Sequence, residues 1–96
     1  MSPFKRKKLN KIRFKLDNLD NKLIKLIKRR TNLVNKVLEL KENKNQIIDK
    51  KRIQTILRNI KKKSLKNNID PKITNRIWKN MIWSYIDYEK RNFKKK

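Results

Sequence analysis

Apolar residues recur along the first part of the chain at alternating steps of three and four. They fall at Leu9, Ile12, Leu16, Leu19, Leu23, Leu26, Leu33, Val37 and Leu40. This heptad-like spacing places apolar side chains along one face of an α-helix, a face that we call the seam. No glycine or proline interrupts it, so we expect one helix from about Lys5–Leu9 to about Glu42. So long a helix in so small a protein needs a partner in another chain or in the rest of its own.

Two shorter apolar patterns follow, and each is introduced by an acidic residue. Asp49 suits the N-cap of a second helix, which we expect to end near Lys66, because its side chain can accept a hydrogen bond from a free backbone N–H group. Asp70 followed by Pro71 is a strong start signal for a third helix. The apolar positions are Ile53, Ile56, Leu57 and Ile60, then Ile73, Ile77, Trp78, Met81, Ile82, Tyr85, Ile86 and Phe93.

Asparagine-rich breaks separate these three patterns. The first runs from Asn43 to Gln46 and the second holds Asn67 and Asn68, and asparagine tolerates the left-handed conformation at a helix end. No strand pattern and no internal repeat appears. We therefore expect an all-α, three-helix chain with a long first helix. Residues 1–96 should form one domain, with an ordered core at about 8–93. The basic tails expected to be loose are Met1–Lys5 and Lys94–Lys96.

Composition excludes several kinds of chemistry. The chain has no cysteine, histidine or glycine. It therefore cannot form a disulfide, a thiolate metal site, a histidine-based triad or a Gly-rich phosphate loop. We expect neither a metal nor a cofactor. No apolar run approaches the length of a membrane span, and no apolar segment of a secretory signal follows the basic N-terminus, which predicts a cytoplasmic protein with no membrane partner.

The charge balance is strongly basic, with 31 lysines and arginines against 8 acidic residues and a formal net charge of +23. Such an excess usually suggests nucleic acid or an anionic membrane. However, the chain is rich in Lys, Asn and Ile, which have AT-rich codons, and lacks Ala and Gly, which have GC-rich codons. The lysines are also spread over the whole chain. We therefore predict no nucleic-acid partner and keep a basic nucleic-acid-binding helical module as an alternative.

Three basic residues of the predicted first helix could bind an anion. Arg30 occupies a seam position where the spacing predicts an apolar residue, so it snorkels out, pairs with an acid or binds a ligand. Lys41 lies roughly 16 Å further along the axis and faces nearly the same way, so the two could grip one small dianion. Arg13 is about 25 Å from Arg30 and could serve only a partner chain's site, as in an antiparallel dimer. Taken singly, each is more often a solvated helix charge.

From about Leu9 to Phe93 the chain resembles the all-helical chorismate mutases. The matching pieces, in order, are LDNLDNKLIKLIKRRTNLVNKV, Lys41, IIDKKR, IDPKITNRIW and YIDYE. The resemblance implies an intertwined antiparallel homodimer in which the long first helix spans both subunits. It also implies the concerted rearrangement of chorismate to prephenate in aromatic amino-acid biosynthesis. That reaction needs no covalent intermediate and no proton transfer, which suits a chain without histidine or cysteine.

The resemblance assigns roles to five residues. It implies that Arg30 grips a substrate carboxylate and that Arg13 is contributed to the neighbouring subunit's site. It implies that Lys41 contacts the ether oxygen of the breaking bond. Asp49 and Arg52 match the acid and the arginine that line the ring side of the substrate at the start of the second helix.

Three further positions of the resemblance concern the substrate. Glu89, in an apolar pattern, matches the glutamine or glutamate that also contacts the ether oxygen; otherwise it is paired to Lys41 or Arg52. As a hydrogen-bond donor it must be the neutral acid, so we expect activity to fall as pH rises. Ile53 stands where the family usually has a glutamate, and Tyr85, a substrate-binding candidate, stands where a serine is common. Isochorismate-pyruvate lyases of the same fold also lack that glutamate and are the alternative. We expect the mutase because its catalytic set is complete: Arg13, Arg30, Lys41 and Glu89.

Overall fold

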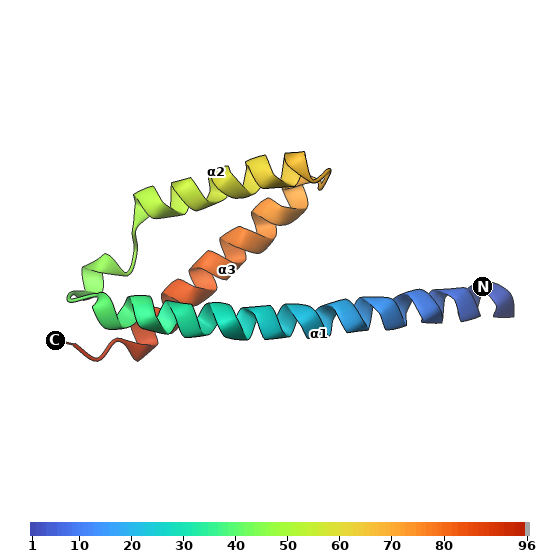
Figure 1. Cartoon of the computed structure of the whole chain (residues 1–96), viewed down its shortest axis with the longest axis horizontal. Helices are drawn as coiled ribbons and strands as arrows, with labels where there is room; N and C mark the ends of the chain where they lie inside the picture. Colours follow the sequence, from blue (N-terminus) through green and yellow to red (C-terminus); the bar gives the residue numbers. More distant parts are fainter. Residues whose placement is uncertain (96) are drawn as a thin grey trace. The chain divides into compact units, whose positions relative to one another are not determined.

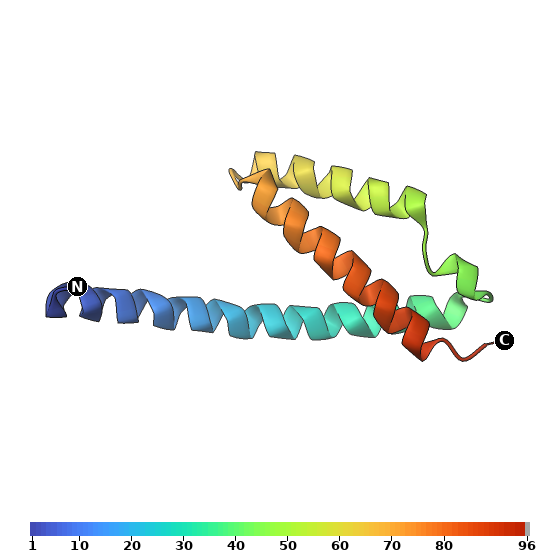
Figure 2. The same ribbon diagram turned by 180° about the vertical axis from the view of Figure 1, so that it is seen from behind.

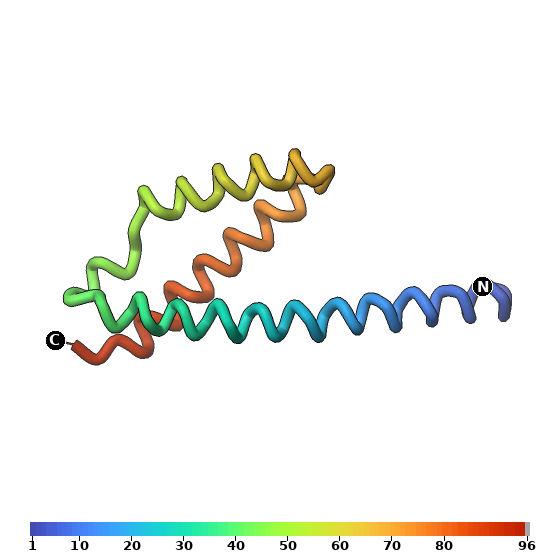
Figure 3. The backbone as a smooth tube through the Cα atoms, in the orientation of Figure 1, coloured from blue at the N-terminus to red at the C-terminus, as the bar shows by residue number. Residues whose placement is uncertain are grey.

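The computed structural model describes residues 1–95, and within that range it holds helices and no strands. The elements in chain order are α1 (Pro3–Leu40), the short 3-10 helix η1 (Lys44–Gln46), α2 (Lys50–Lys66) and α3 (Pro71–Asn92) (Figure 1; Figure 3). For the described residues, the prediction of an all-α chain with three main helices and a long first one is therefore confirmed.

The N-terminal end of α1 lies earlier than expected. The helix begins at Pro3, whereas the seam placed its start at about Lys5–Leu9. Ser2 explains the difference, because its Oγ accepts a hydrogen bond from the Lys5 N–H at 3.2 Å and its carbonyl accepts one from the Arg6 N–H at 2.9 Å. A serine cap followed by proline at the first position is a favourable helix start. The N-terminal tail that we expected to be loose is therefore helical from Pro3.

The C-terminal end of α1 lies before the expected one. The helix ends at Leu40, so Lys41 lies on the connecting segment to η1 and not on the helix face that the heptad count gave it. Gln46 explains the early end, because its Oε1 accepts hydrogen bonds from the N–H groups of Glu42 and Asn43 at 2.7 and 3.0 Å. These N–H groups would otherwise continue the helix ladder. Asn43 is extended, with φ −126°, so the left-handed residue we considered for this break is absent from it.

The chain divides into two compact units, Met1–Val34 and Asn35–Lys96, and each is described by itself. The first unit consists almost entirely of the first part of α1. Leu9 and Val34 are half-buried, but most of its apolar side chains remain about half exposed or more. These are Phe4, Ile12, Phe14, Leu16, Leu19, Leu23, Ile24, Leu26, Ile27 and Leu33. The first unit therefore has no hydrophobic core of its own among the described residues.

The second unit is a helical hairpin with a small core. Helices α2 and α3 pack against each other and are joined by a tight turn, and they diverge away from it (Figure 1; Figure 2). Asp49 and Asp70 cap them as expected, through hydrogen bonds from the N–H groups of Arg52 and Lys72 at 3.0 and 2.9 Å. The core consists of Ile47, Ile82 and Ile86, with Ile48, Ile53, Ile56, Leu57 and Phe93 packed around it.

The turn of the hairpin is held by a buried polar contact that the sequence did not reveal. Asn68 takes the left-handed conformation, with φ 56°, as its break allowed. Ser64 is only 2% exposed, and its Oγ donates to the Ile60 carbonyl at 2.6 Å and shares a hydrogen bond of 2.7 Å with Thr74 Oγ1. The Ile69 N–H donates to the Ser64 carbonyl at 2.8 Å. One serine thus ties the end of α2 to the first turn of α3.

The C-terminal tail after α3 is partly described. Lys94 and Lys95 lie outside any regular element, and the last residue of the expected loose tail, Lys96, lies outside the described residues. In the described part of the chain, every helix is too short or too polar to cross a bilayer.

Candidate functional site

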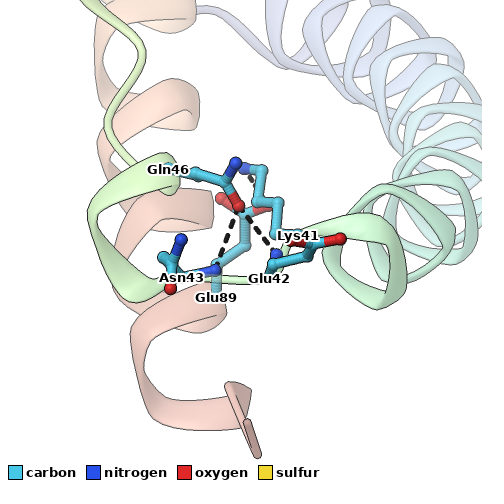
Figure 4. A network of polar contacts seen from close by, with 5 residues as sticks. All are labelled: Lys41, Glu42, Asn43, Gln46 and Glu89. Carbon is cyan, nitrogen blue, oxygen red and sulfur yellow. Dashed lines mark hydrogen bonds and ion pairs between the residues drawn. The ribbon is translucent and has the colours of Figure 1, made fainter. Parts of the chain in front are cut away.

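The centre of the candidate site is an ion pair between Lys41 and Glu89. The Lys41 Nζ lies 3.0 Å from Glu89 Oε1, and the two side chains are 19% and 8% exposed (Figure 4). A charge removed from water in this way is costly unless a partner compensates it. Of the two bases considered for Glu89, the structure pairs it with Lys41. The closing acid of α3 and the lysine after α1 thus meet, although they are far apart in the sequence.

The segment around Lys41 is held in place by polar contacts from both sides. On the η1 side, Gln46 binds the two N–H groups that follow Lys41, as Figure 4 shows. On the α3 side, the Tyr88 hydroxyl donates to Asn35 Oδ1 at 2.7 Å. Leu38, which is 9% exposed, adds apolar contact at the last turn of α1. The last turn of α1 and the end of α3 are therefore fixed together within the second unit.

Asp49 is the N-cap of α2, and Arg52 lies in the first turn of that helix. The carboxylate of Asp49 accepts the Arg52 N–H at 3.0 Å, so one of its oxygens is already used as a helix cap. Asp49 and Lys41 line a common open pocket on the surface of the second unit. The other lining residues are Val37, Leu40, Gln46, Ile48, Lys50 and Lys51. Two predicted site residues thus share a pocket whose charged lining residues are three lysines and Asp49.

Tyr85 and Ile53, the two positions that depart from the family pattern, are both half-buried. Tyr85 is half-buried and its ring meets that of Tyr88 edge to face, with centroids 6.4 Å apart and planes at 88°. Ile53 is half-buried and packs against the core of the second unit. Ile53 therefore acts as a core residue, and its side chain offers no polar group to a ligand.

Arg13 and Arg30 belong to the first unit, whereas the residues just described belong to the second. Both lie in α1, where Arg13 is exposed and Arg30 is half-buried. The contacts around Lys41 and Glu89 lie within the second unit, so the roles expected for these two arginines stay predictions.

Sequence reasoning missed Gln46, Asn35 and Tyr88, which shape the site without belonging to its predicted set. Gln46 had a local signal, because it follows Asn43 by the three residues of a capping box. Asn35 and Tyr88 had none, because a contact between residues 53 positions apart leaves no pattern in either helix.

The chemistry available at this site is electrostatic. A half-buried ammonium group lies on a pocket wall, with a buried carboxyl group against it, and such a fixed cation can stabilise negative charge that develops on a bound oxygen. Among residues 1–95 there is no cluster of three His, Cys, Asp or Glu side chains that could hold a metal ion.

Comparisons with known proteins give one match. A search of curated proteins and a search of solved structures each found nothing similar. The family model described as chorismate mutase type II matches residues 12–90. That range contains Arg13, Arg30, Lys41, Asp49, Arg52, Tyr85 and Glu89. The chain therefore belongs to the chorismate mutase type II family.

Proposed function

We propose that this chain is a chorismate mutase that converts chorismate to prephenate, with Lys41 as its main electrostatic catalyst. The observation that carries the proposal is the Lys41–Glu89 pair at 3.0 Å, beside the start of α2 and inside the matched family range. In this rearrangement a C–O bond breaks while a C–C bond forms within one molecule. The protein needs to hold a dianion in a compact geometry and to stabilise charge on the ether oxygen.

Lys41 suits this task because its ammonium group has N–H donors that its contact with Glu89 does not use. An ammonium donates three hydrogen bonds, and the described contact with Glu89 uses one of them. Another N–H can point at the ether oxygen of a substrate in the neighbouring pocket. As the C–O bond breaks, negative charge grows on that oxygen, so the contact strengthens towards the transition state and raises the rate.

Glu89 takes part as a neutral acid in this proposal. A carboxylate has no proton to donate, and its charge would repel the developing charge on the ether oxygen. A protonated Glu89 can donate a hydrogen bond to the same oxygen while Lys41 remains beside it. The ion pair of the structure then corresponds to the resting site, and protonation of Glu89 leaves Lys41 free to turn its charge towards the substrate.

The arginines complete the site in an intertwined antiparallel homodimer. Arg30 binds one substrate carboxylate and Arg13 of the partner chain binds the other, since a guanidinium fork matches a carboxylate better than an ammonium does. The exposed seam of the first unit supports this arrangement, because a helix with so much uncovered apolar surface gains stability by packing against a second copy.

An isochorismate-pyruvate lyase is the second candidate, and Ile53 favours it. The family's usual glutamate at this place would bind the ring hydroxyl of chorismate, and an isoleucine packed into the core cannot. In the mutase, Asp49 or a water molecule takes over that contact, and Asp49 already lines the pocket with Lys41.

The test is a product assay on the purified chain with both substrates. We expect chorismate absorbance to fall and prephenate to appear, with no pyruvate released. Isochorismate should be converted slowly or not at all. Pyruvate release from isochorismate, with chorismate left unchanged, would assign the lyase activity. No turnover of either substrate, together with strong salt-dependent binding of nucleic acid, would favour the basic nucleic-acid-binding module.

A further inference from the structure

The end of α1 lacks a favourable charge within its own sequence. The last carbonyl groups of a helix have no partner inside the helix, and a cation near them is stabilising. The last turn of α1 contains no basic residue, and it carries the acidic Glu39. A cation from elsewhere in the chain that binds these carbonyl groups would therefore stabilise this helix end.

Lys95 supplies that cation from the tail after α3. Its Nζ donates a hydrogen bond to the backbone carbonyl of Glu39 and another, of 3.0 Å, to the backbone carbonyl of Lys41. The tail runs along the same surface, where Asn92, Phe93, Lys94 and Lys95 share a pocket with Asn35, Leu38 and Glu39. The tail that we expected to be loose therefore binds the end of α1 through Lys95.

These contacts act on the backbone of the proposed catalyst. Lys41 lies one residue past the end of α1, so the regular hydrogen bonds of the helix do not hold its backbone. It is held by three contacts: its N–H donates to the Leu38 carbonyl at 3.2 Å, its carbonyl accepts from Lys95, and its side chain pairs with Glu89. A catalytic group outside a regular element depends on such support, because a small displacement of the reacting contact lowers the rate steeply.

We propose that Lys95 is a positioning residue, which aligns Lys41 with the substrate by holding the backbone carbonyls of Glu39 and Lys41. This assignment rests on the proposed mutase function. Lys95 does not touch the substrate and acts through Lys41. The fold has other anchors at this place, namely the Tyr88–Asn35 hydrogen bond and the buried Leu38, so losing Lys95 should loosen Lys41 and leave the hairpin intact.

The experiment compares three variants of the full chain with wild type. Lys95→Met keeps the length of the side chain and removes its donors, and Lys95→Arg restores a charged donor. Lys94→Met makes the same change in charge one residue away in the same tail.

We expect Lys95→Met to lower kcat about tenfold, which is the scale of losing a hydrogen bond to a charged group. KM should change little because the substrate contacts remain. Lys95→Arg should recover most of the rate, and Lys94→Met should behave as wild type.

A second readout observes the contact itself. In uniformly ¹³C-labelled protein, the carbonyl resonances of Glu39 and Lys41 should shift in Lys95→Met and stay in place in Lys94→Met. Unchanged carbonyl resonances in Lys95→Met would overturn the proposal, and so would equal kcat values for Lys95→Met and Lys94→Met. A wild-type chain that does not convert chorismate would overturn the mutase function and this assignment together. An active wild type with an unaffected Lys95→Met variant would overturn the assignment alone.

Discussion

The two units of the chain differ in whether they have a hydrophobic core of their own. The first unit, Met1–Val34, is a helical segment whose apolar seam is exposed, with Leu23 at 54% and Leu33 at 60%. The second unit, Asn35–Lys96, has a core of its own around Ile47, Ile82 and Ile86. It also carries the Lys41–Glu89 pair. The first unit thus has apolar surface without a core, whereas the second has a core together with polar chemistry.

This difference indicates what each unit would contribute to the proposed dimer. Fully burying one leucine contributes roughly 1.5–3 kcal/mol, and seam residues that stay half exposed leave much of that unused. A second copy that covers the seam would recover it and would bring in a further pair of arginines. The second unit would supply the electrostatic catalyst, and the first would supply the dimer contact and the arginines.

The largest effect should come from a charge placed in the seam. Leu23→Asp should abolish the dimer and with it the activity, because each copy of the interface would bury a carboxylate among apolar side chains. Sedimentation velocity gives the mass, and the chorismate assay gives the activity. Lys22→Gln makes the same change in charge at an exposed position outside the seam and should leave both unchanged. A Leu23→Asp chain that keeps the mass and turnover of wild type would show that the seam is not the interface.

The next largest effect should come from the arginines of the first unit. Arg13→Ala and Arg30→Ala homodimers should each be nearly inactive if every site takes Arg30 from one chain and Arg13 from the other. When the two variants exchange subunits, each heterodimer has one site lacking both arginines and one complete site, so activity should return. Native mass spectrometry verifies that heterodimers have formed. Verified heterodimers without activity would contradict the shared site.

A smaller but still large effect is expected for the catalyst of the second unit. Lys41→Ala should lower kcat by about a hundredfold or more, which is the scale of losing one preorganised charge contact. The dimer should persist, because Lys41 is not one of the seam residues that form the proposed interface. Lys44→Ala, in the neighbouring η1, removes an exposed charge and should be neutral. Circular dichroism and sedimentation verify the fold of both variants, and turnover of Lys41→Ala within a few-fold of wild type would exclude Lys41 from the mechanism.

The helices could be predicted from local signals because their ends are determined by neighbouring residues. Asp49 and Asp70–Pro71 indicated the starts of α2 and α3, and the structure confirms both caps. The end of α1 was misplaced because it depends on Gln46, which binds N–H groups beyond Leu40 and thereby removes Lys41 from the helix. A heptad count describes which face a residue takes in a continuing helix and cannot reveal where a side chain stops that helix.

The contacts of the candidate site were partly predictable. Glu89 stood out as an acid among apolar positions, and Lys41 was one of its two possible partners, so the sequence limited the pairing without deciding it. Lys95 and the Tyr88–Asn35 hydrogen bond could not be foreseen, because a lysine in a basic tail and an asparagine in a polar helix look like ordinary solvated residues. Such contacts depend on the hairpin bringing the two ends of the second unit together.

The smallest effect on activity at neutral pH should come from Glu89→Gln. The informative measurement for this variant is how its activity depends on pH. The substitution supplies an N–H donor at every pH, keeps the size of the side chain and releases Lys41 from its ion pair. Wild-type kcat/KM should fall as pH rises, because ionised Glu89 cannot donate to the ether oxygen and holds the charge of Lys41. The variant should have a flatter profile and exceed wild type at alkaline pH, measured over the range in which circular dichroism shows an intact fold. Asp87→Asn is the matched control on α3, since it neutralises an acid of the exposed Asp87–Arg91 pair and should keep the wild-type profile. A wild-type profile that is flat or rises with pH, with the glutamine variant no better at high pH, would leave Glu89 as a structural partner of Lys41 only.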